Sequence, residues 1–482
     1  MGHKMGLSPE EIRHNVSPVG EIPYESERKF SAAFYQQNGT THVAAKGAVE
    51  VILRFCGKMQ LRDGVKPLNR EVIEQQADMM SGKGLRVLAV AGRVYSDSVT
   101  KGVYDDGDIS NLVFHGLLGF IDPLRPEAVE SVKKCKEAGI QVMMITGDHP
   151  STAGAIAKEL KLTDRDERVV TGQQLSETGT PDSPAYERLV SSTHVFARAS
   201  PVQKLEIVDV LIRRGEFVAV TGDGVNDAPA LRRANIGVAM GSGTDVAKEV
   251  GLMIVTDDNF ASIVSGVEEG RFAYDNVRKV IYLLISTGTA EVFMFIASIF
   301  AGLPIPLLAV QLLWLNLVTN GIQDVALAFE GGEPGAMKRK PRKTSEGIFN
   351  EQMVSQTLVS GLAIGSLAFA AWYWLVEIRT MDEASARNII LLLMVLMQNV
   401  HVFNCRSETV SAFKVPLRRN YVLIGGVMLA QLIHILSMQL PFMQGILRTE
   451  PVHPSHWLLA CVIALVLLAV MEVFKLMRHR KA

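Results

Sequence analysis

Residues 217–231, FVAVTGDGVNDAPAL, place two carboxylates and an amide within five positions of one another. A largely apolar run leads directly into Asp223, Asn226 and Asp227. Carboxylate oxygens bind Mg²⁺ well, and an amide can donate hydrogen bonds to the oxygens of a phosphoryl group. The residue types and their spacing therefore indicate a magnesium and phosphate site at the end of a buried strand.

Two further polar segments follow apolar runs in the same part of the chain. Thr146, Gly147 and Asp148 end the run IQVMMI, and Lys204 lies shortly after HVFARAS. From about residue 113 to 268, apolar runs alternate with predicted helices, which is typical of a doubly wound α/β domain with a parallel sheet. Such sheets bind ligands at the carboxyl ends of their strands. We therefore expect these polar residues to converge and to carry out phosphoryl transfer.

The carboxyl-terminal part of the chain is mostly apolar and predicts a membrane bundle. Six blocks approach the length of about 20 residues that spans a bilayer, and mostly short polar loops separate them. The blocks are residues 280–303, 309–329, 357–376, 388–405, 421–441 and 457–474. Six such blocks in succession favour six transmembrane helices over the buried helices of a soluble protein.

Charge and cysteine usage limit the location and the partners of the chain. Basic runs follow the second, fourth and sixth blocks, at residues 337–343, 413–419 and 477–481. The positive-inside rule places these loops, and with them the soluble part and both termini, in the cytoplasm. A net charge of −1 gives no support to nucleic-acid binding. The four cysteines form no C-x-x-C pair, which argues against a disulfide framework or a thiolate metal site.

One apolar block carries an oxygen-rich stripe. Polar residues recur in block 309–329 at positions i, i+3, i+4, i+7 and i+8, which predicts one face of a helix. They are Asn316, Thr319, Asn320, Gln323 and Asp324. Glu291 lies at mid-depth in the preceding block. An ionisable group at the bilayer centre costs roughly 2.5–3.5 kcal/mol. The two carboxylates therefore indicate a site for a dehydrated cation, which prefers oxygen ligands.

A second polar pair lies in block 388–405, where Gln398 and His401 share one helical face. Two interpretations stay open for this pair. The side chains can hold the bundle together through hydrogen bonds between helices, as polar residues in membrane proteins often do. Alternatively, they can belong to the path of the cation, because polar groups inside a membrane are frequently functional.

Three longer segments resemble the P-type ATPases, a family of ATP-driven cation pumps. They are MMITGDHPSTAGAIAKELKL, VFARASPVQKLEIV and VAVTGDGVNDAPALRRANIGVAMGSGTDVAKE. The resemblance begins near residue 20, covers nearly all of the chain after it, and is greatest to the calcium-pump branch. It implies a partial nucleotide-binding domain over 1–112, a haloacid-dehalogenase-like phosphorylation domain over 113–268, and a six-helix transmembrane domain over 269–482.

The resemblance also implies roles for the polar residues of the phosphorylation domain. Asp223 is implied to hold Mg²⁺, and Asp227 to support the phosphorylation site and the metal. Thr146, Lys204 and Asn226 are implied to contact the phosphoryl group. ATP and Mg²⁺ are accordingly the expected cofactors.

In the nucleotide-binding part, the resemblance implies an adenine pocket. Lys46, with Gly47 after it in the K-G-A motif, is implied to lie against the adenine, and Arg86 to reach the phosphates. Tyr24 stands where the family usually has Phe, and its aromatic face can still stack on a base. Read without the resemblance, Lys46 and Arg86 are ordinary surface charges, and the chain has no Walker A motif.

The chain departs from the family pattern at the nucleophile. The family's aspartate in D-K-T-G-T is absent, as are the actuator's T-G-E loop and the first four membrane helices. Asp122, with Pro123 in the implied hinge FIDPLRPE, lacks the Lys and Thr that should follow. We therefore expect a phosphorylation sheet without its first, central strand, and a chain that is inactive alone. A free-standing haloacid-dehalogenase-type phosphatase would need its own D-x-D nucleophile at the end of a predicted strand, and none is found there.

Two alternatives to a pump component stay open, and so does the choice of ion. The chain can be one half of a split pump whose amino-terminal half is a separate polypeptide, or a truncated and catalytically silent membrane protein. Calcium is the first choice of ion, with sodium or potassium as alternatives. Asn320 and Gln398 stand where the calcium-pump pattern has carboxylates, and Asp324 adds one a turn later. The expected location is a lipid bilayer, the plasma membrane of a bacterium.

Overall fold

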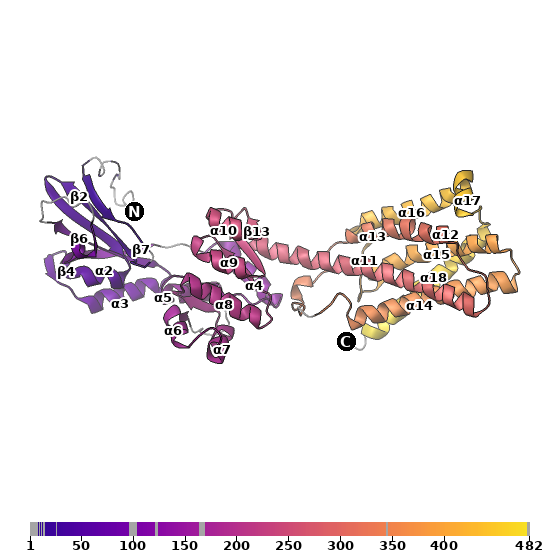
Figure 1. Cartoon of the computed structure of the whole chain (residues 1–482), viewed down its shortest axis with the longest axis horizontal. Coiled ribbons are helices and arrows are strands. Elements are labelled where there is room, and N and C mark those ends of the chain that lie inside the picture. The colour runs from indigo at the N-terminus through magenta and orange to yellow at the C-terminus, as the bar shows by residue number, and fades with distance from the viewer. Residues whose placement is uncertain are drawn as a thin grey trace. The chain divides into compact units, whose positions relative to one another are not determined.

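The computed structural model describes residues 8, 10, 12, 15–25, 27–95, 104–120, 124–162, 169–343 and 346–479. The chain divides into two compact units, Met1–Val264 and Ser265–Ala482. Strands and helices together make up the first unit, and the second is helical (Figure 1).

A seven-stranded sheet occupies the first part of the first unit. Its strands lie in the order β1-β2-β3-β6-β7-β4-β5, and every neighbouring pair is antiparallel except β4 and β7. The strands are β1 (Ser17–Ile22), β2 (Phe30–Gln37), β3 (Thr40–Gly47), β4 (Cys56–Leu61), β5 (Gly64–Pro67), β6 (Arg86–Tyr95) and β7 (Leu112–Phe120). Alternate residues such as Phe30 and Phe34 are buried, as expected for strands with one covered face. Helices α2 (Val49–Phe55) and α3 (Arg70–Ser81) pack on the sheet (Figure 1).

Strand β7 extends this sheet beyond the predicted domain boundary at residue 112. The run NLVFHGLLGFID was expected to open the phosphorylation domain, but its strand pairs with β6 and β4 instead. Leu112 and Phe114 complete the core of the seven-stranded sheet. The apolar pattern predicted a strand correctly but could not say which neighbours it would find, because pairing depends on tertiary packing. The implied hinge residues Asp122 and Pro123 lie outside the described residues.

The remainder of the first unit holds parallel strands joined by helices, as the alternating pattern predicted. It contains α4 (Pro126–Glu137), β8 (Met144–Ile145), α5 (Pro150–Glu159), β9 (Val170–Thr171), α6 (Gly172–Glu177), α7 (Pro184–Ser192), β10 (Val195–Ala197), α8 (Pro201–Arg213), β11 (Ala219–Gly222), η3 (Val225–Asp227), α9 (Ala228–Arg233), β12 (Ile236–Met240), α10 (Asp245–Val250) and β13 (Met253–Val255). The strands form two separate sheets, β8-β10-β9 and β11-β12-β13, rather than one.

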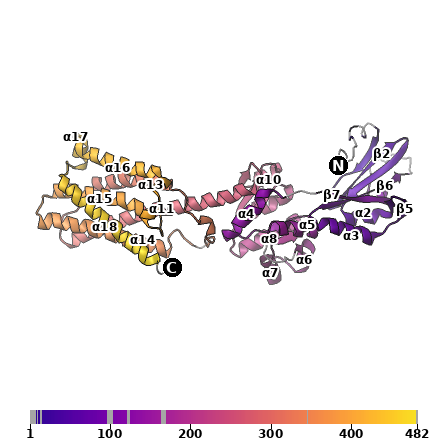
Figure 2. The same ribbon diagram turned by 180° about the vertical axis from the view of Figure 1, so that it is seen from behind.

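Within the described residues, five helices are long and apolar enough to cross a membrane. They are α11 (Phe260–Phe300), α14 with η6 (Glu351–Ile378), α15 (Glu383–Cys405), α16 (Tyr421–Gln439) and α18 (Pro454–Arg478), with the short α17 (Pro441–Leu447) between the last two. They run side by side in both views (Figures 1 and 2). Helix α15 is central, since 83% of its apolar window is buried against 22–39% in the others.

The second predicted block, 309–329, is not one long α-helix. It consists of α12 (Ala309–Trp314), the π-helical segment η4 (Leu315–Asn320) and α13 (Gly321–Ala328), which follow one another without a break. A π-helical segment is rare, and such segments are often found at functional sites. Here it coincides with three of the five residues of the polar stripe, so the stripe does not follow the regular helical register that the sequence predicted.

Candidate functional site

The predicted phosphoryl-transfer residues lie on the loops that follow β8, β10 and β11. Lys204 is in the first turn of α8, which begins with a capping box between Ser200 and Gln203. Its Nζ lies 2.6 Å from Asp227 Oδ1, and both side chains are mostly buried, at 17% and 16% exposure. Asp227 Oδ2 also accepts a hydrogen bond from the Gly224 N–H, at 3.2 Å. The two strand-end loops are therefore joined by a short ion pair.

The Thr146-Gly147-Asp148 loop is bound to the segment that leads into α8. Thr146 Oγ1 donates to Asp148 Oδ2 at 3.0 Å, and the Asp148 N–H donates to Thr146 Oγ1 at 3.1 Å. The N–H groups of Arg198 and Ala199 donate to the carbonyls of Asp148 and Thr146, both at 3.1 Å. The structure thus places this loop next to the β10–α8 connection that carries Lys204.

Asp223 and Asn226 are exposed side chains in the loop after β11. The backbone of Asp223 is fixed from the following segment, where the Thr244 N–H donates to its carbonyl at 2.8 Å. A Cβ on Gly243 would lie 2.9 Å from that carbonyl oxygen, so only glycine fits there without displacement. No hydrogen bond or ion pair among the described residues joins Asp223 or Asn226 to Thr146. The predicted convergence is therefore established for Lys204 with Asp227 but stays a prediction for the others.

Support for the Asp223 loop comes from residues that the sequence did not single out. The Ser242 N–H donates to Asp258 Oδ1 at 2.9 Å, and this bond holds the pKa of the Asp258 carboxyl below its ordinary value. Arg125 donates to the carbonyl of Asp258. The motif GSGTD after β12 was quoted only for its resemblance, and no spacing rule would have assigned it this supporting role.

The carboxylates fit a magnesium ion that a phosphate group helps to bind. The part of the chain that the structure describes has no group of three His, Cys, Asp or Glu side chains that could hold a metal ion. Mg²⁺ commonly takes only one or two carboxylates together with waters and phosphate oxygens. Asp223 offers a free carboxylate, and Asp227 offers one that Lys204 already neutralises.

Both parallel sheets have an open edge at this site. Among the described strands, β8 pairs only with β10, and β11 pairs only with β12. Ala219 and Thr221 of β11 are exposed along that edge. The polar loops after β8 and β11 follow these two edge strands. That a strand of the phosphorylation sheet is missing stays a prediction.

The predicted nucleotide residues lie on the seven-stranded sheet. Lys46 of β3 is paired with Val90 of β6, and Arg86 lies four residues before Val90 on the same strand. Side chains two or four residues apart share a face, so Lys46 and Arg86 lie on one face, about 13 Å apart along the strand. Both are exposed. Tyr24 follows β1 and is 60% exposed. No described contact connects Tyr24 to the other two.

Gly47 is required by close packing at the end of β3. A Cβ at this position would lie 2.6 Å from the Lys29 carbonyl oxygen and 2.6 Å from Phe30 Cβ. Gly147, by contrast, has open space around it, with nothing within 4 Å of an added Cβ. The structure thus explains one of the two glycines by packing and leaves the other without a packing reason.

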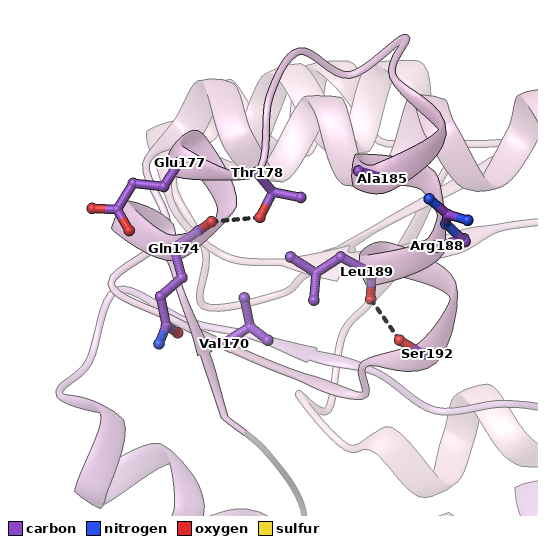
Figure 3. A pocket seen from close by; sticks show the side chains of 8 residues that line it. All are labelled: Val170, Gln174, Glu177, Thr178, Ala185, Arg188, Leu189 and Ser192. Carbon is purple, nitrogen blue, oxygen red and sulfur yellow. Dashed lines mark hydrogen bonds between the residues drawn. The ribbon is translucent and has the colours of Figure 1, made fainter.

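An open groove of about 570 Å³ lies between α6 and α7, away from these loops (Figure 3). It is lined by Val170, Gln174, Glu177, Thr178, Ala185, Arg188, Leu189 and Ser192. The hydroxyls of Thr178 and Ser192 donate to carbonyls of their own helical segments, at 2.8 and 3.2 Å. Its polar lining is therefore satisfied locally, and we assign it no chemistry.

In the second unit, Glu291 of α11 contacts the π-helical segment. Glu291 is 9% exposed, and its Oε2 accepts a hydrogen bond from Asn316 Nδ2 at 3.2 Å. Asn320 Nδ2 donates to Asn316 Oδ1 at 3.1 Å and to Thr287 Oγ1 of α11 at 3.3 Å. The structure therefore brings Glu291, Asn316 and Asn320 together, and adds Thr287, which the sequence analysis did not select.

The polar stripe divides between two neighbouring helices. Asn316 and Asn320 face α11, whereas Gln323 Nε2 donates to Asn399 Oδ1 on α15 at 2.6 Å. Asn399 Nδ2 in turn donates to Gln431 Oε1 on α16 at 2.7 Å. Asp324 is eight residues after Asn316, or about 12 Å along the helix axis. Glu291 and Asp324 therefore lie at different levels of the bundle.

Five buried oxygens of Glu291 and of the polar stripe have no hydrogen-bond partner among the described residues. They are Glu291 Oε1, Thr319 Oγ1, Asn320 Oδ1, Gln323 Oε1 and Asp324 Oδ1. An unpaired buried polar atom costs about 1–3 kcal/mol. All five are oxygens, the atom type that a hard cation takes as ligands. We name these five atoms the unpartnered oxygens. Gln398, the remaining predicted ligand, has no described contact with them.

Comparisons with known proteins match most of the chain. The family described as "P-type ATPase, cytoplasmic domain N" matches residues 1–127, and "Cation transporting ATPase, C-terminus" matches residues 304–477. Two families described as "haloacid dehalogenase-like hydrolase" match residues 96–235 and 206–266. These matches agree with the order of regions that the sequence resemblance implied.

Curated relatives extend over nearly the whole chain. A "Calcium-transporting ATPase" of Bacillus subtilis is 37% identical over 462 residues, which is 95% of this chain and 51% of the relative. A "Probable cation-transporting ATPase F" of Mycobacterium bovis is 39% identical, covering 94% of this chain and 50% of the relative. A "Calcium-transporting ATPase 1" of Lactococcus lactis is 35% identical, covering 98% and 53%. The chain thus spans about half the length of the curated relatives it matches.

Proposed function

Because this chain is homologous to the carboxyl-terminal portion of P-type cation-transporting ATPases, we propose that it forms that portion of an ATP-driven cation pump. The observation that carries the transport part of the proposal is the set of five unpartnered oxygens. Buried oxygens inside an apolar helical unit are costly unless ligands complete them, and dehydrated cations at more than one level of the bundle would do so.

The phosphoryl-transfer part rests on the loops after β8, β10 and β11. Lys204 would neutralise charge on a phosphoryl group and hold Asp227 in place through their ion pair. Thr146 and Asn226 would donate hydrogen bonds to phosphoryl oxygens, with Gly147 and Asp148 shaping the first loop. Asp223 and Asp227 would hold Mg²⁺, which supplies neutralisation of the charge that develops on the transferred group.

The nucleotide part rests on the exposed face of the seven-stranded sheet. Lys46 and Arg86 share that face. A nucleotide with its base near Lys46 and its phosphates near Arg86 would match their spacing and charge, because a cation and a phosphate attract. Tyr24 would supply the aromatic face for stacking. Gly47 would keep the end of β3 close to its neighbours.

Calcium is the proposed ion, on the branch resemblance and on the names of two of the relatives. Sodium or potassium stays the alternative, because Asn320 and Gln398 are neutral where carboxylates were expected. We also propose six spans, with the block 309–329 as the second, both termini in the cytoplasm, and the plasma membrane of a bacterium as the location.

The open edges of β8 and β11 explain why we expect no phosphoenzyme from this chain alone. The nucleophile of the family precedes the nucleotide domain, in a strand that this sequence does not contain. A strand from an amino-terminal polypeptide would pair with the two edges and bring its aspartate to Asp223 and Lys204. The alternative is a truncated, catalytically silent membrane protein, which would not require such a strand.

The test is phosphorylation with γ-labelled ATP, followed by acid quenching and a gel. We expect no acid-stable label on the chain alone. Adding a polypeptide that corresponds to the amino-terminal half of the Bacillus subtilis relative should produce a label on the added polypeptide, and Asp223→Asn should abolish it. A hydroxylamine-sensitive label on this chain alone would show that a different aspartate reacts.

The ion is tested in the same assembled pump. Glu291→Gln and Asp324→Asn should each raise the cation concentration needed for half-maximal ATP hydrolysis. Because the two carboxylates lie at different levels of the bundle, the double variant should show the product of the two shifts. Unchanged cation dependence in both single variants would assign these residues to helix packing.

A further inference from the structure

Three side-chain amides form a continuous hydrogen-bonded chain across the bundle, from α13 through α15 to α16. Gln323 Nε2 on α13 donates to Asn399 Oδ1 on α15 at 2.6 Å, and Asn399 Nδ2 donates to Gln431 Oε1 on α16 at 2.7 Å. Gln323 and Asn399 are buried. We call these three residues the amide chain. Polar side chains that meet inside an apolar bundle often hold its helices together, and such a role is the alternative to the one argued below.

The amide chain has a direction, because its hydrogen bonds are all donated toward α16. Its two ends are therefore different. Among the described residues, Gln323 Oε1 at the α13 end has no hydrogen-bond partner, and neither has Gln431 Nε2 at the α16 end. If every amide of the chain rotated by half a turn, the bonds would run the other way and Gln323 would present its Nε2 instead. Aligned hydrogen bonds polarise one another, so the orientation of Gln323 is coupled to that of Gln431.

The free oxygen of Gln323 lies about one helical turn from a second unpartnered oxygen, Thr319 Oγ1. Both residues are 0% exposed, and the segment η4, which carries Thr319, packs against α15 as Gln323 does. A side-chain amide oxygen is a ligand for a hard cation, whereas an amide N–H group only donates and cannot bind one. The orientation of the Gln323 amide therefore decides whether this position can hold an ion.

We propose that Asn399 and Gln431 are positioning residues that keep the side-chain oxygen of Gln323 free to bind the transported cation. Gln431 accepts a hydrogen bond from Asn399 and so fixes which way the Asn399 amide points. Asn399 then accepts from Gln323 Nε2, which leaves Gln323 Oε1 unoccupied. Both residues act through Gln323. The inference rests on the proposed function, because it assigns the groups that orient one ligand of the proposed ion.

Equilibrium binding of radiolabelled Ca²⁺ tests the proposal, on the full chain in lipid nanodiscs and on the same chain assembled with the amino-terminal polypeptide. Na⁺ and K⁺ are the probes if Ca²⁺ does not bind. Gln431→Met removes the last acceptor of the amide chain, so that the Asn399 amide can point either way. We expect the cation concentration at half-saturation to rise about two- to tenfold, which corresponds to the net contribution of one hydrogen bond.

Gln356→Met is the matched control for the loss of a buried amide. Gln356 of α14 is 1% exposed and donates to the Glu408 carbonyl, outside the amide chain. This variant should leave the half-saturating concentration unchanged.

Gln323→Glu separates a positioning role from a packing role. The introduced carboxylate presents an oxygen whichever way it points, so Gln431→Met should no longer shift the half-saturating concentration in this background. A packing role predicts the same shift in both backgrounds. Asn399→Leu gives a second test if Gln431→Met fails to fold. It breaks the amide chain one bond nearer to Gln323 and should raise the concentration by at least as much, again only when Gln323 is unsubstituted.

The measurement distinguishes failure of this inference from failure of the proposed function. Equal shifts with and without Gln323→Glu, or no shift from either Gln431→Met or Asn399→Leu, overturn the positioning role and leave the proposed function intact. If neither the chain nor the assembled pump binds any of the three cations saturably, the proposed function is overturned, and the positioning role with it.

Discussion

The two units of the molecule leave different kinds of hydrogen-bonding group without partners. In the described part of the first unit, β8 and β11 each pair with one strand only, which leaves a backbone edge open, and one buried side-chain atom, Arg93 Nε, has no partner. In the second unit the unpartnered groups are side-chain atoms in the interior of the helical bundle. A free strand edge is completed by another strand, whereas an isolated buried oxygen is completed by an ion or a water molecule. An open strand edge can therefore accept another strand, and unpartnered side-chain atoms can accept small ligands.

The units also differ in how they hold their polar groups in place. The second unit contains a fully buried ion pair, in which Arg406 donates to both oxygens of Glu330 at 3.0 and 2.9 Å. Asn420 donates to the same carboxylate at 3.2 Å, so the pair joins the ends of α13, α15 and α16. In the first unit the corresponding pair, Lys204 with Asp227, is near the surface and joins only two loops. Removing a partner should therefore cost more in the second unit.

The largest effect is expected for Glu330→Ala. It leaves the Arg406 guanidinium buried without its carboxylate, which should lower the free energy of unfolding by about 3–5 kcal/mol. All four tryptophans of the sequence, Trp314, Trp372, Trp374 and Trp457, lie in the second unit, so tryptophan fluorescence during denaturation reports this unit alone. Glu383→Ala, which breaks the more exposed pair with Arg387, is the control and should cost about 0.2–1 kcal/mol. Equal losses would remove the distinction between buried and exposed pairs.

A smaller decrease in the free energy of unfolding is expected for Lys204→Met in the first unit. Asp227 would keep its bond from Gly224 but lose the charged partner, at a cost of about 1.5–3 kcal/mol. Pulsed hydrogen exchange along a urea titration can follow residues 144–255 separately from the bundle. Lys204→Arg keeps the charge and should recover most of the loss. A loss as large as that of Glu330→Ala would contradict the ranking of the two units.

Two glycines in the strand-end loops offer a matched pair. A Cβ on Gly222 would lie 2.5 Å from Asp227 Cβ, whereas Gly147 has nothing within 4 Å. Gly222→Ala should therefore destabilise the first unit by about 1–3 kcal/mol through overpacking. Gly147→Ala should stay within about 0.5 kcal/mol of the unsubstituted chain. The same urea titration measures both, and a reversed order would show that the Asp227 loop is less closely packed than the structure indicates.

The smallest expected effect concerns the open sheet edges. Amides of β11 should exchange with solvent about tenfold faster than those of β12, which is paired on both sides. Adding the amino-terminal polypeptide should slow exchange in β8 and β11 while β12 changes little. Hydrogen-exchange mass spectrometry resolves these segments. If β11 is already as protected as β12 in the isolated chain, its edge is covered by something other than a missing strand.

Much of the organisation could be predicted from the sequence, because it depends on local patterns. Alternating apolar runs and helices predicted parallel strands in the first unit, and long apolar blocks predicted membrane-length helices in the second. The motif around Asp223, Asn226 and Asp227 predicted a phosphate-binding loop after a strand. These signals lie within short windows, where the pattern of residue types predicts the secondary structure.

Other features were decided only by tertiary structure, because they depend on which segments meet. The strand Leu112–Phe120 pairs within the seven-stranded sheet, and the parallel strands form two sheets with open edges. Within the π-helical segment Leu315–Asn320, Asn316 contacts α11. Farther along the polar stripe, Gln323 contacts α15. Residue spacing does not predict such a division of the stripe. Asn316 bonds to Glu291, which is 25 residues away in the sequence, and Gln323 bonds to Asn399, which is 76 residues away.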